Sequence, residues 1–176
     1  YLERLKKAGY TSFAMDASPL YRSKEAEAKA HEMGLPALRK ERGSYLGRLE
    51  KGEKLADEDL VRLQNLNRLI QEAEEAVALV GLRDNIDRTA KAWRYLEGVN
   101  PTLEGEVGEI GSIAVDEITG EPLINPETGK IQQEVTTVAE AKVFLREFAR
   151  LGIKLDFLAI NNGTSHGVEY TGLDIT

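Results

Sequence analysis

Three short segments that suit β-strands, separated by long helix-forming stretches, constrain the fold of this chain most. Residues 11–15, 103–107 and 155–160 are too short to be helices and suit buried strands. Strands that alternate with helices are joined by crossover connections, so we expect them to form a parallel sheet. The chain has 176 residues and 41% hydrophobic content, which is enough for one compact domain with its own core. The predicted fold class is therefore α/β.

The stretch between the first two strands is predicted to be several helices in series. It is rich in Glu, Lys, Arg, Leu and Ala, with expected breaks at Gly34-Leu35-Pro36, at Gly52 and around Gly81. We expect one helix to begin near Asp57 and a last one to cover residues 83–97. An apolar stripe at helical spacing indicates an amphipathic hairpin that packs on the domain or on a partner. The stripe consists of Leu60, Leu63, Leu66, Leu69, Ile70, Ala73, Val77 and Val80.

Two further elements are expected after the second strand. Residues 113–136 contain two turn sequences and are interpreted as a surface excursion, in the form of a β-hairpin. Thr137 and Glu140 have the spacing of a capping box, which predicts a helix from there to a stop at Gly152.

The composition argues against several classes of partner. A net charge of -7 and a pI near 5.0 do not suit a protein that binds the phosphate backbone, so no nucleic acid is expected. No apolar run approaches the roughly 20 residues that cross a bilayer, so we expect no membrane segment. The chain has no cysteine, which excludes thiol catalysis and is compatible with a cytoplasmic protein.

Polar residues at the predicted strand ends are the candidate functional residues. Asp16 follows the first strand, Glu104 and Glu106 lie in the second, and His166 follows the third. The two glutamates are two residues apart and so point the same way, into either a barrel interior or the helical layer. Imidazole together with carboxylates suits a divalent ion such as zinc. Simpler roles stay open: a hydrogen-bonded loop histidine, an aspartate that forms a turn, and an internal salt bridge.

Small residues surround the histidine in the segment LAINNGTSHG. Gly163 and Gly167 permit close approach of the backbone, so amide groups there could meet an anion such as phosphate.

Three segments, YTSFAMDAS, LEGEVGEIGS and LAINNGTSHG, occur in this order and resemble the class II, metal-dependent fructose-bisphosphate aldolases and their ketose-bisphosphate relatives. The second segment is similar to the acidic signature of that family, and the third to its Gly-Thr-Ser-His-Gly motif. The resemblance covers the two ends of the chain. It implies a (β/α)8 TIM barrel, of which residues 1–176 would be the middle portion and residues 19–82 a helical insertion.

The resemblance also implies an activity and roles for residues. The expected reaction is reversible aldol cleavage of a ketose bisphosphate, with fructose 1,6-bisphosphate the favoured substrate, to dihydroxyacetone phosphate and an aldehyde. His166 would be a zinc ligand, and Asp16 and Glu106 would serve both catalysis and the metal region, supported by Glu104. Gly167 would contact the substrate phosphate. A second divalent or monovalent cation, a homo-oligomeric state and a cytoplasmic location are expected with it.

The chain departs from the family pattern at several points. It lacks the upstream Asp-His strand end and the downstream His-Gly-Gly-Ser-Gly loop, so the remaining zinc ligands are expected outside this sequence. Ile113 follows the acidic signature where the family has a glutamate, and Asp116 and Glu117 are the nearest replacements. Two alternatives therefore stay open. One is a catalytically inactive barrel relative that uses its helical insertion as a binding module, and the other is a related sugar-phosphate lyase or isomerase.

Overall fold

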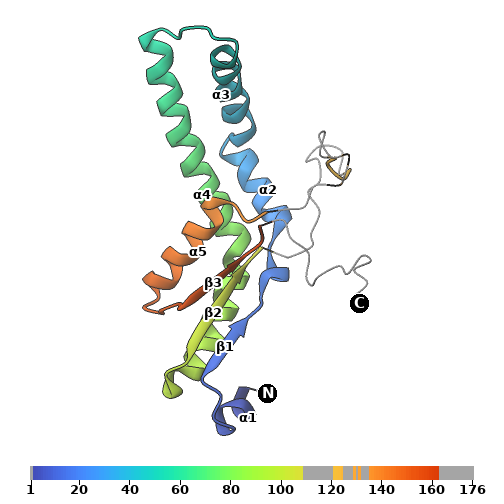
Figure 1. The fold of residues 1–176 in the computed structure, drawn as a ribbon, viewed down its shortest axis with the longest axis vertical. Coiled ribbons are helices and arrows are strands. Elements are labelled where there is room, and N and C mark those ends of the chain that lie inside the picture. Colours follow the sequence, from blue (N-terminus) through green and yellow to red (C-terminus); the bar gives the residue numbers. More distant parts are fainter. Residues whose placement is uncertain (1, 109–120, 125–128, 130, 132–134, 163–176) are drawn as a thin grey trace, which may run out of the picture.

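The structure is a computed structural model, and it describes residues 2–108, 121–124, 129, 131 and 135–162. Figure 1 shows a small parallel sheet at one end of an elongated molecule and a bundle of helices that extends away from it. The elements are, in chain order, α1 (Leu2–Lys7), β1 (Ser12–Met15), η1 (Ser18–Leu20), α2 (Ser23–Glu32), α3 (Leu35–Glu50), α4 (Asp57–Leu96), η2 (Glu97–Val99), β2 (Thr102–Val107), α5 (Val138–Arg150) and β3 (Phe157–Ile160).

The three strands form a parallel sheet in the order β1-β2-β3. Phe13 pairs with Leu103, and Gly105 pairs with Leu158. The strand order thus follows the chain order, and α4 and α5 both pack on one face of the sheet. A doubly wound sheet would instead have helices on both faces and a reversal in strand order. The predicted α/β fold with a parallel sheet is confirmed, with three strands in the part of the chain that the structure describes.

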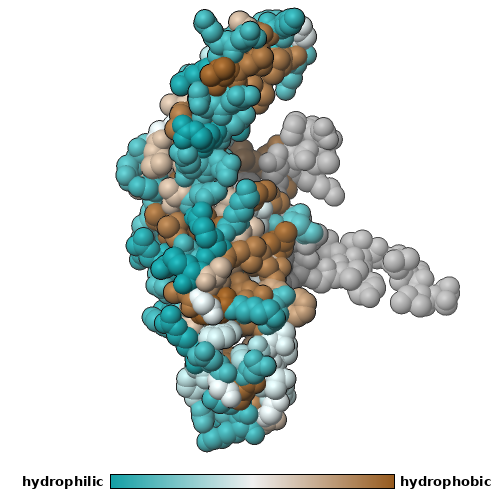
Figure 2. All heavy atoms as spheres, turned by 90° about the vertical axis from the view of Figure 1, so that its left-hand side faces the viewer, coloured by the Kyte–Doolittle hydropathy of each residue, from teal (hydrophilic) through white to brown (hydrophobic). Residues whose placement is uncertain are grey.

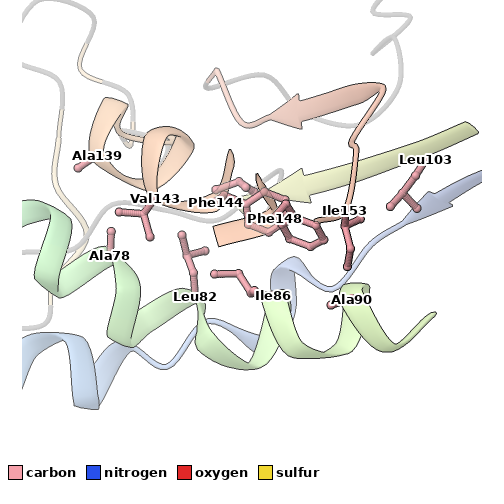
Figure 3. Packing of buried hydrophobic residues seen from close by; sticks show 11 residues of the cluster. Ala78, Leu82, Ile86, Ala90, Leu103, Ala139, Val143, Phe144, Phe148 and Ile153 are labelled. Carbon is pink, nitrogen blue, oxygen red and sulfur yellow. The ribbon is translucent and has the colours of Figure 1, made fainter. Parts of the chain in front are cut away.

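One hydrophobic core joins the sheet to these two helices. Figure 3 shows the buried side chains of α4, from Ala78 to Ala90, facing those of α5, from Ala139 to Phe148, in the same order along both helices. The rings of Phe144 and Phe148 lie 4.7 Å apart. Gly105 in β2 allows α5 to approach closely, because a Cβ atom there would lie 2.8 Å from the Phe144 ring. This core fixes β2 against both helices.

The helices α2 and α3 and the first half of α4 form a second unit, which we call the arm (residues 23–77). A separate small cluster of Leu35, Ile70 and Ala73 holds it together. Val77 packs against that cluster, whereas Ala78 belongs to the core beside the sheet. The packing of α4 therefore divides between these two residues. Assignment of residues 19–82 to an insertion stays a prediction, and its boundary at residue 82 lies inside α4.

Ion pairs connect the two long helices of the arm. Arg62 donates two hydrogen bonds to Glu41, at 2.7 and 2.8 Å, and Arg39 and Arg48 of α3 reach Glu74 and Asp59 of α4. All of these groups lie near the surface, so each pair contributes little to stability, about 0–1 kcal/mol. These ion pairs align α3 with α4, while the apolar stripe of α4 supplies the hydrophobic contact between the two helices. The stripe is buried in its middle, at Leu66, Ile70 and Ala73, and exposed at its start, where Leu60 is 42% accessible. Figure 2 shows hydrophobic surface at this far end of the arm.

The predicted break around Gly81 is wrong. α4 runs without interruption through this glycine over 40 residues. Gly81 is a site of close packing instead: a Cβ atom there would lie 2.3 Å from the ring of Tyr21. The backbone amide of Arg22 also donates to the Gly81 carbonyl at 3.0 Å. Glycine is present because the incoming chain touches the helix, while the helix itself does not end.

The other expected elements are found within two residues of their predicted bounds. Breaks occur after α2 at Gly34 and after α3 at Gly52, and the capping box of Thr137 and Glu140 is formed. Of the expected hairpin in residues 113–136, most lies outside the described residues, and the structure shows one antiparallel bridge, Ile124 to Ile131. In the described ranges, none of the helices combines the length and the apolar character that crossing a membrane requires.

Candidate functional site at the carboxyl edge of the sheet

The carboxyl ends of the three parallel strands lie at one edge of the sheet, and two of the predicted site residues are found there. Met15 is paired with Gly105, and both residues are oriented toward the helices. Asp16 and Glu106 are the residues that follow this pair on the neighbouring strands β1 and β2. Successive residues of a strand point to opposite faces of the sheet. The positions of Asp16 and Glu106 therefore face away from the helical layer.

The two glutamates of β2 lie on the face of the sheet opposite the helices. Leu103 and Val107 are fully buried on the helical side, and Gly105 lies between them. Glu104 and Glu106 alternate with these residues and are half-buried. In Figure 1, α4 lies behind the sheet, and the strands are seen from the face that carries the glutamates. The sequence left open whether the two glutamates point toward the helical layer or away from it. In the structure they point away from the helices.

Asp16 forms a local turn where the chain leaves β1. Its Oδ1 accepts hydrogen bonds from the backbone amide of Ser18 at 3.1 Å and from the Ser18 hydroxyl at 2.6 Å. Asp16 is exposed, while Ser18 is buried. The turn-forming role considered for this aspartate is therefore present. It also holds the carboxylate at the edge of the sheet.

Thr136 ties the ends of β2 and β3 together, which the sequence did not predict. Its hydroxyl donates to the Val107 carbonyl at 2.6 Å and accepts from the Asn161 amide at 2.9 Å. The Thr136 amide donates to the Asn161 carbonyl at 2.8 Å. Gly108 makes room for this contact: its φ is +88°, and a Cβ atom would lie 2.5 Å from the Thr136 hydroxyl oxygen. A glycine directly after a strand was the available signal for such a close approach.

Asn85 is a second residue that the sequence interpretation missed. It is fully buried in α4, and its Nδ2 donates to the backbone carbonyl of Glu106 at 2.8 Å. Its Oδ1 accepts from the hydroxyl of Thr89, also fully buried, at 3.2 Å. Two polar residues four positions apart within an apolar helix face were the signal that could have identified this pair. Asn85 holds in place the strand segment that contains Glu106.

At the other end of the sheet, where the strands begin, the polar contacts are different. Asp156 accepts from Lys154 at 2.7 Å and from the backbone amide of Leu103 at 3.1 Å. These two hydrogen bonds, the one from Lys154 first, lower the pKa of the Asp156 carboxyl below its usual range. A shallow cavity of about 300 Å³ lies beside them, lined in part by Trp93 and Thr102. Here the carboxylate is engaged in joining the start of β2 to β3.

The residues predicted to bind a metal ion lie only partly within the described part of the chain. Asp16 and Glu106 offer carboxylate oxygens, which suit a divalent ion. His166 and Gly167 lie outside the residues that the structure describes. Within the described ranges, no group of three His, Cys, Asp or Glu side chains could hold a metal ion. The structure therefore brings two of the four predicted residues to one edge of the sheet.

Comparison with known proteins gives one match. The sequence model of the family described as "Fructose-bisphosphate aldolase class-II" matches residues 77–176. No curated protein and no solved structure matches the chain. The match begins at the point where α4 leaves the arm and joins the core beside the sheet, and it includes β2, α5 and β3. It covers more than half of the sequence, and the chain therefore belongs to the class II fructose-bisphosphate aldolase family.

Proposed function

We propose that this protein is a metal-dependent lyase that cleaves a ketose bisphosphate reversibly to dihydroxyacetone phosphate and an aldehyde. The observation that carries this proposal is the family match over residues 77–176, which includes the acidic segment and the LAINNGTSHG segment. The family's description names a fructose bisphosphate, and fructose 1,6-bisphosphate is the favoured substrate. Family membership at this level supports an aldolase-type lyase acting on a phosphorylated sugar.

The proposed fold of the full catalytic unit is a (β/α)8 barrel. Two features support it: the strand order follows the chain order, and both packed helices cover the same face of the sheet. The other face carries Glu104 and Glu106 and exposes Phe157 to 61%. In a closed barrel that face would line the interior, and the carboxyl edge of the strands would form the active-site rim.

The residues present fit a divalent metal, and zinc is the ion we propose. Asp16 and Glu106 would supply oxygen donors, and His166 would supply an imidazole nitrogen. A bound divalent ion polarises a ketone carbonyl and stabilises negative charge on its oxygen. Glu106 or Asp16 would accept or return the proton that carbon–carbon cleavage moves. The backbone at Gly167 would bind the substrate phosphate through amide groups.

The test uses the full-length protein and its two histidines. His166→Ala is expected to lower bound zinc, measured by elemental analysis, and to abolish cleavage of fructose 1,6-bisphosphate. His31→Ala is the matched control, because His31 is exposed in α2, which belongs to the arm and not to the edge of the sheet. It should leave zinc content and cleavage unchanged. Normal activity and zinc content in His166→Ala would refute the assignment of this residue. A zinc-loaded, folded wild-type protein without cleavage of any ketose bisphosphate would favour the inactive binding module.

A further inference from the structure

A cavity of about 230 Å³ lies between the arm and the beginning of α5. It is separate from the carboxyl edge of the sheet and is formed by helices alone. Ile70 and Ala139 contribute apolar lining. The polar lining comes from α3, α4 and α5, and consists of Arg42, Asn67, Gln71, Glu74, Glu75 and Lys142.

The two carboxylates in this lining are already neutralised by cations outside the cavity. Glu74 accepts from Arg39 at 3.1 Å. Glu75 accepts from Arg146 at 2.6 Å and from Gln71 at 3.1 Å. Arg42 and Lys142 do not form these ion pairs. Positive charges therefore outnumber negative ones among the lining residues and the two arginines paired with them.

Arg42 is the most unusual member of the lining. Its Nε is buried and has no hydrogen-bond partner among the residues that the structure describes. A buried donor without a partner costs about 1–3 kcal/mol, and more when the group is charged. Lys142, across the cavity on α5, forms no ion pair within the part of the chain that the structure describes and interacts with Glu75 only through space. Two cations on two different helices thus border one cavity, and one of them has an unsatisfied donor.

The start of α5 also borders the cavity, and its capping box already places the Glu140 carboxylate on the Thr137 amide. Val138 and Ala139, the first two residues of this helix, line the cavity. The amino end of a helix has a partial positive charge, which favours anions. The guanidinium group of arginine binds carboxylate and phosphate groups in a bidentate manner.

We propose that this cavity is a binding site for a small oxyanion, a phosphate or carboxylate group, held between Arg42 of the arm and Lys142 of α5. The ligand pairs with the charged side chains of both residues and connects the arm to the helix that packs on the sheet. The site takes a free small molecule, and its binding links the two units of the molecule. It is independent of the aldolase reaction, because none of its residues lies at the edge of the sheet that carries Asp16 and Glu106.

The test is a titration of the full-length, ¹⁵N-labelled protein followed by NMR. The Nε–H signal of Arg42 is assigned by its loss in Arg42→Lys, and inorganic phosphate and malonate are added in separate titrations at constant ionic strength. We expect a saturable shift of this signal, and the tighter of the two anions tells whether phosphate or carboxylate is preferred. Chloride should give no saturable shift. If neither oxyanion shifts the Arg42 signal, the proposal is wrong.

Charge-removing variants supply the controls. Lys142→Met, followed at the Arg42 signal, should weaken binding by about tenfold or more, as expected for loss of a charge-assisted contact. Arg42→Met, followed at the side-chain amide of Gln71, should do the same. Lys40→Met removes an exposed cation of α3 that does not line the cavity, and should leave affinity within about twofold. Equal weakening by Lys40→Met would show a nonspecific charge effect and would overturn the proposal. Phosphate bound at the aldolase site would leave the Arg42 signal unmoved, so the two proposals fail separately.

Discussion

Gly81 lies under the ring of Tyr21, and the contact between them decides how this helix position responds to substitution. Alanine is favoured over glycine in a helix interior by about 1 kcal/mol. At Gly81, however, the added Cβ atom would lie within 3 Å of two ring carbons and the hydroxyl oxygen of Tyr21. Tyr21 also packs against the core, and the neighbouring Arg22 amide bonds to the Gly81 carbonyl. The ring is therefore not free to move aside.

We expect Gly81→Ala to lower the free energy of unfolding by roughly 1–2 kcal/mol, because overpacking outweighs the gain in helix propensity. Gly43→Ala in α3 is the matched control: no atom of the described residues lies within 4 Å of its new Cβ atom, so it should stabilise the protein by about 0.5–1 kcal/mol. Urea denaturation followed by circular dichroism measures both. In a Tyr21→Ala background, Gly81→Ala should become stabilising; if it stays destabilising there, the ring contact is not the cause.

Asn85 satisfies the backbone carbonyl of Glu106, and its removal should be costly. Asn85→Ala leaves that carbonyl and the Thr89 hydroxyl without their partner in a fully buried place, so we expect a loss of about 2–3 kcal/mol in unfolding free energy. Asn67→Ala, at an exposed position of the same helix, should change it by less than about 0.5 kcal/mol. Equal effects of the two variants in chemical denaturation would mean that Asn85 does not hold β2 in place.

At the scale of elements, sequence patterns predicted most helices and strands because the signals were local. The capping box of Thr137 and Glu140 fixed the start of α5, and Gly34 and Gly52 marked real ends of helices. The break predicted at Gly81 was wrong because this glycine accommodates the ring of Tyr21, about 60 residues earlier in the chain. Local rules cannot distinguish a glycine that ends a helix from one that makes room for a distant side chain.

The ion pair between α4 and α5 gives a prediction for the effect of pH. Hydrogen bonds from Gln71 and Arg146 lower the pKa of the Glu75 carboxyl below its ordinary value of 4.5. A carboxyl with a lowered pKa in the folded state stabilises the protein above the unfolded pKa, and this contribution is lost as the pH falls through the folded pKa. Glu75→Gln should therefore reduce the loss of stability below pH about 4.5.

The size of this effect should be small, no more than about 1 kcal/mol, because Arg146 is largely exposed. Glu72→Gln removes a carboxylate of an exposed pair within α4, Arg68 to Glu72, and serves as the control. Thermal unfolding between pH about 3 and 7 measures both variants. If Glu72→Gln reduces the loss of stability at low pH as much as Glu75→Gln does, the ion pair between α4 and α5 is not the cause of that loss.

At the scale of the whole molecule, the arm and the sheet unit have separate cores, so the arm should be removable. Its two ends are adjacent, because the amide of Arg22 is hydrogen-bonded to the carbonyl of Gly81. Replacing residues 25–76 of the full-length protein by a short Gly/Ser linker should preserve cooperative unfolding and the parallel sheet. Hydrogen exchange should show unchanged protection of β2 amides. Loss of that protection would mean that the arm is needed for the sheet core.

The candidate site could be predicted only in part. The placement of Asp16 and Glu106 at one edge was predictable because residues that end parallel strands meet there, while their roles stay predictions. Asn85 and Thr136 were missed because their roles depend on contacts with backbone groups of other elements, at Glu106 and Val107, which no short motif encodes. The roles of His166 and Gly167 stay predictions, since both residues lie outside the described part of the chain.

The absence of a joint in α4 has a mechanical consequence. A single helix extends from the free end of the arm at Asp57 to Asn85, a distance of about 40 Å, and Asn85 is hydrogen-bonded to the backbone of Glu106. The arm cannot swing at a loop along this path, because described helix is continuous throughout. A partner that pushed the far end sideways would tilt the helix as a rigid lever. Through the hydrogen bond of Asn85, this tilt would first displace the carbonyl of Glu106 among the polar groups of the sheet.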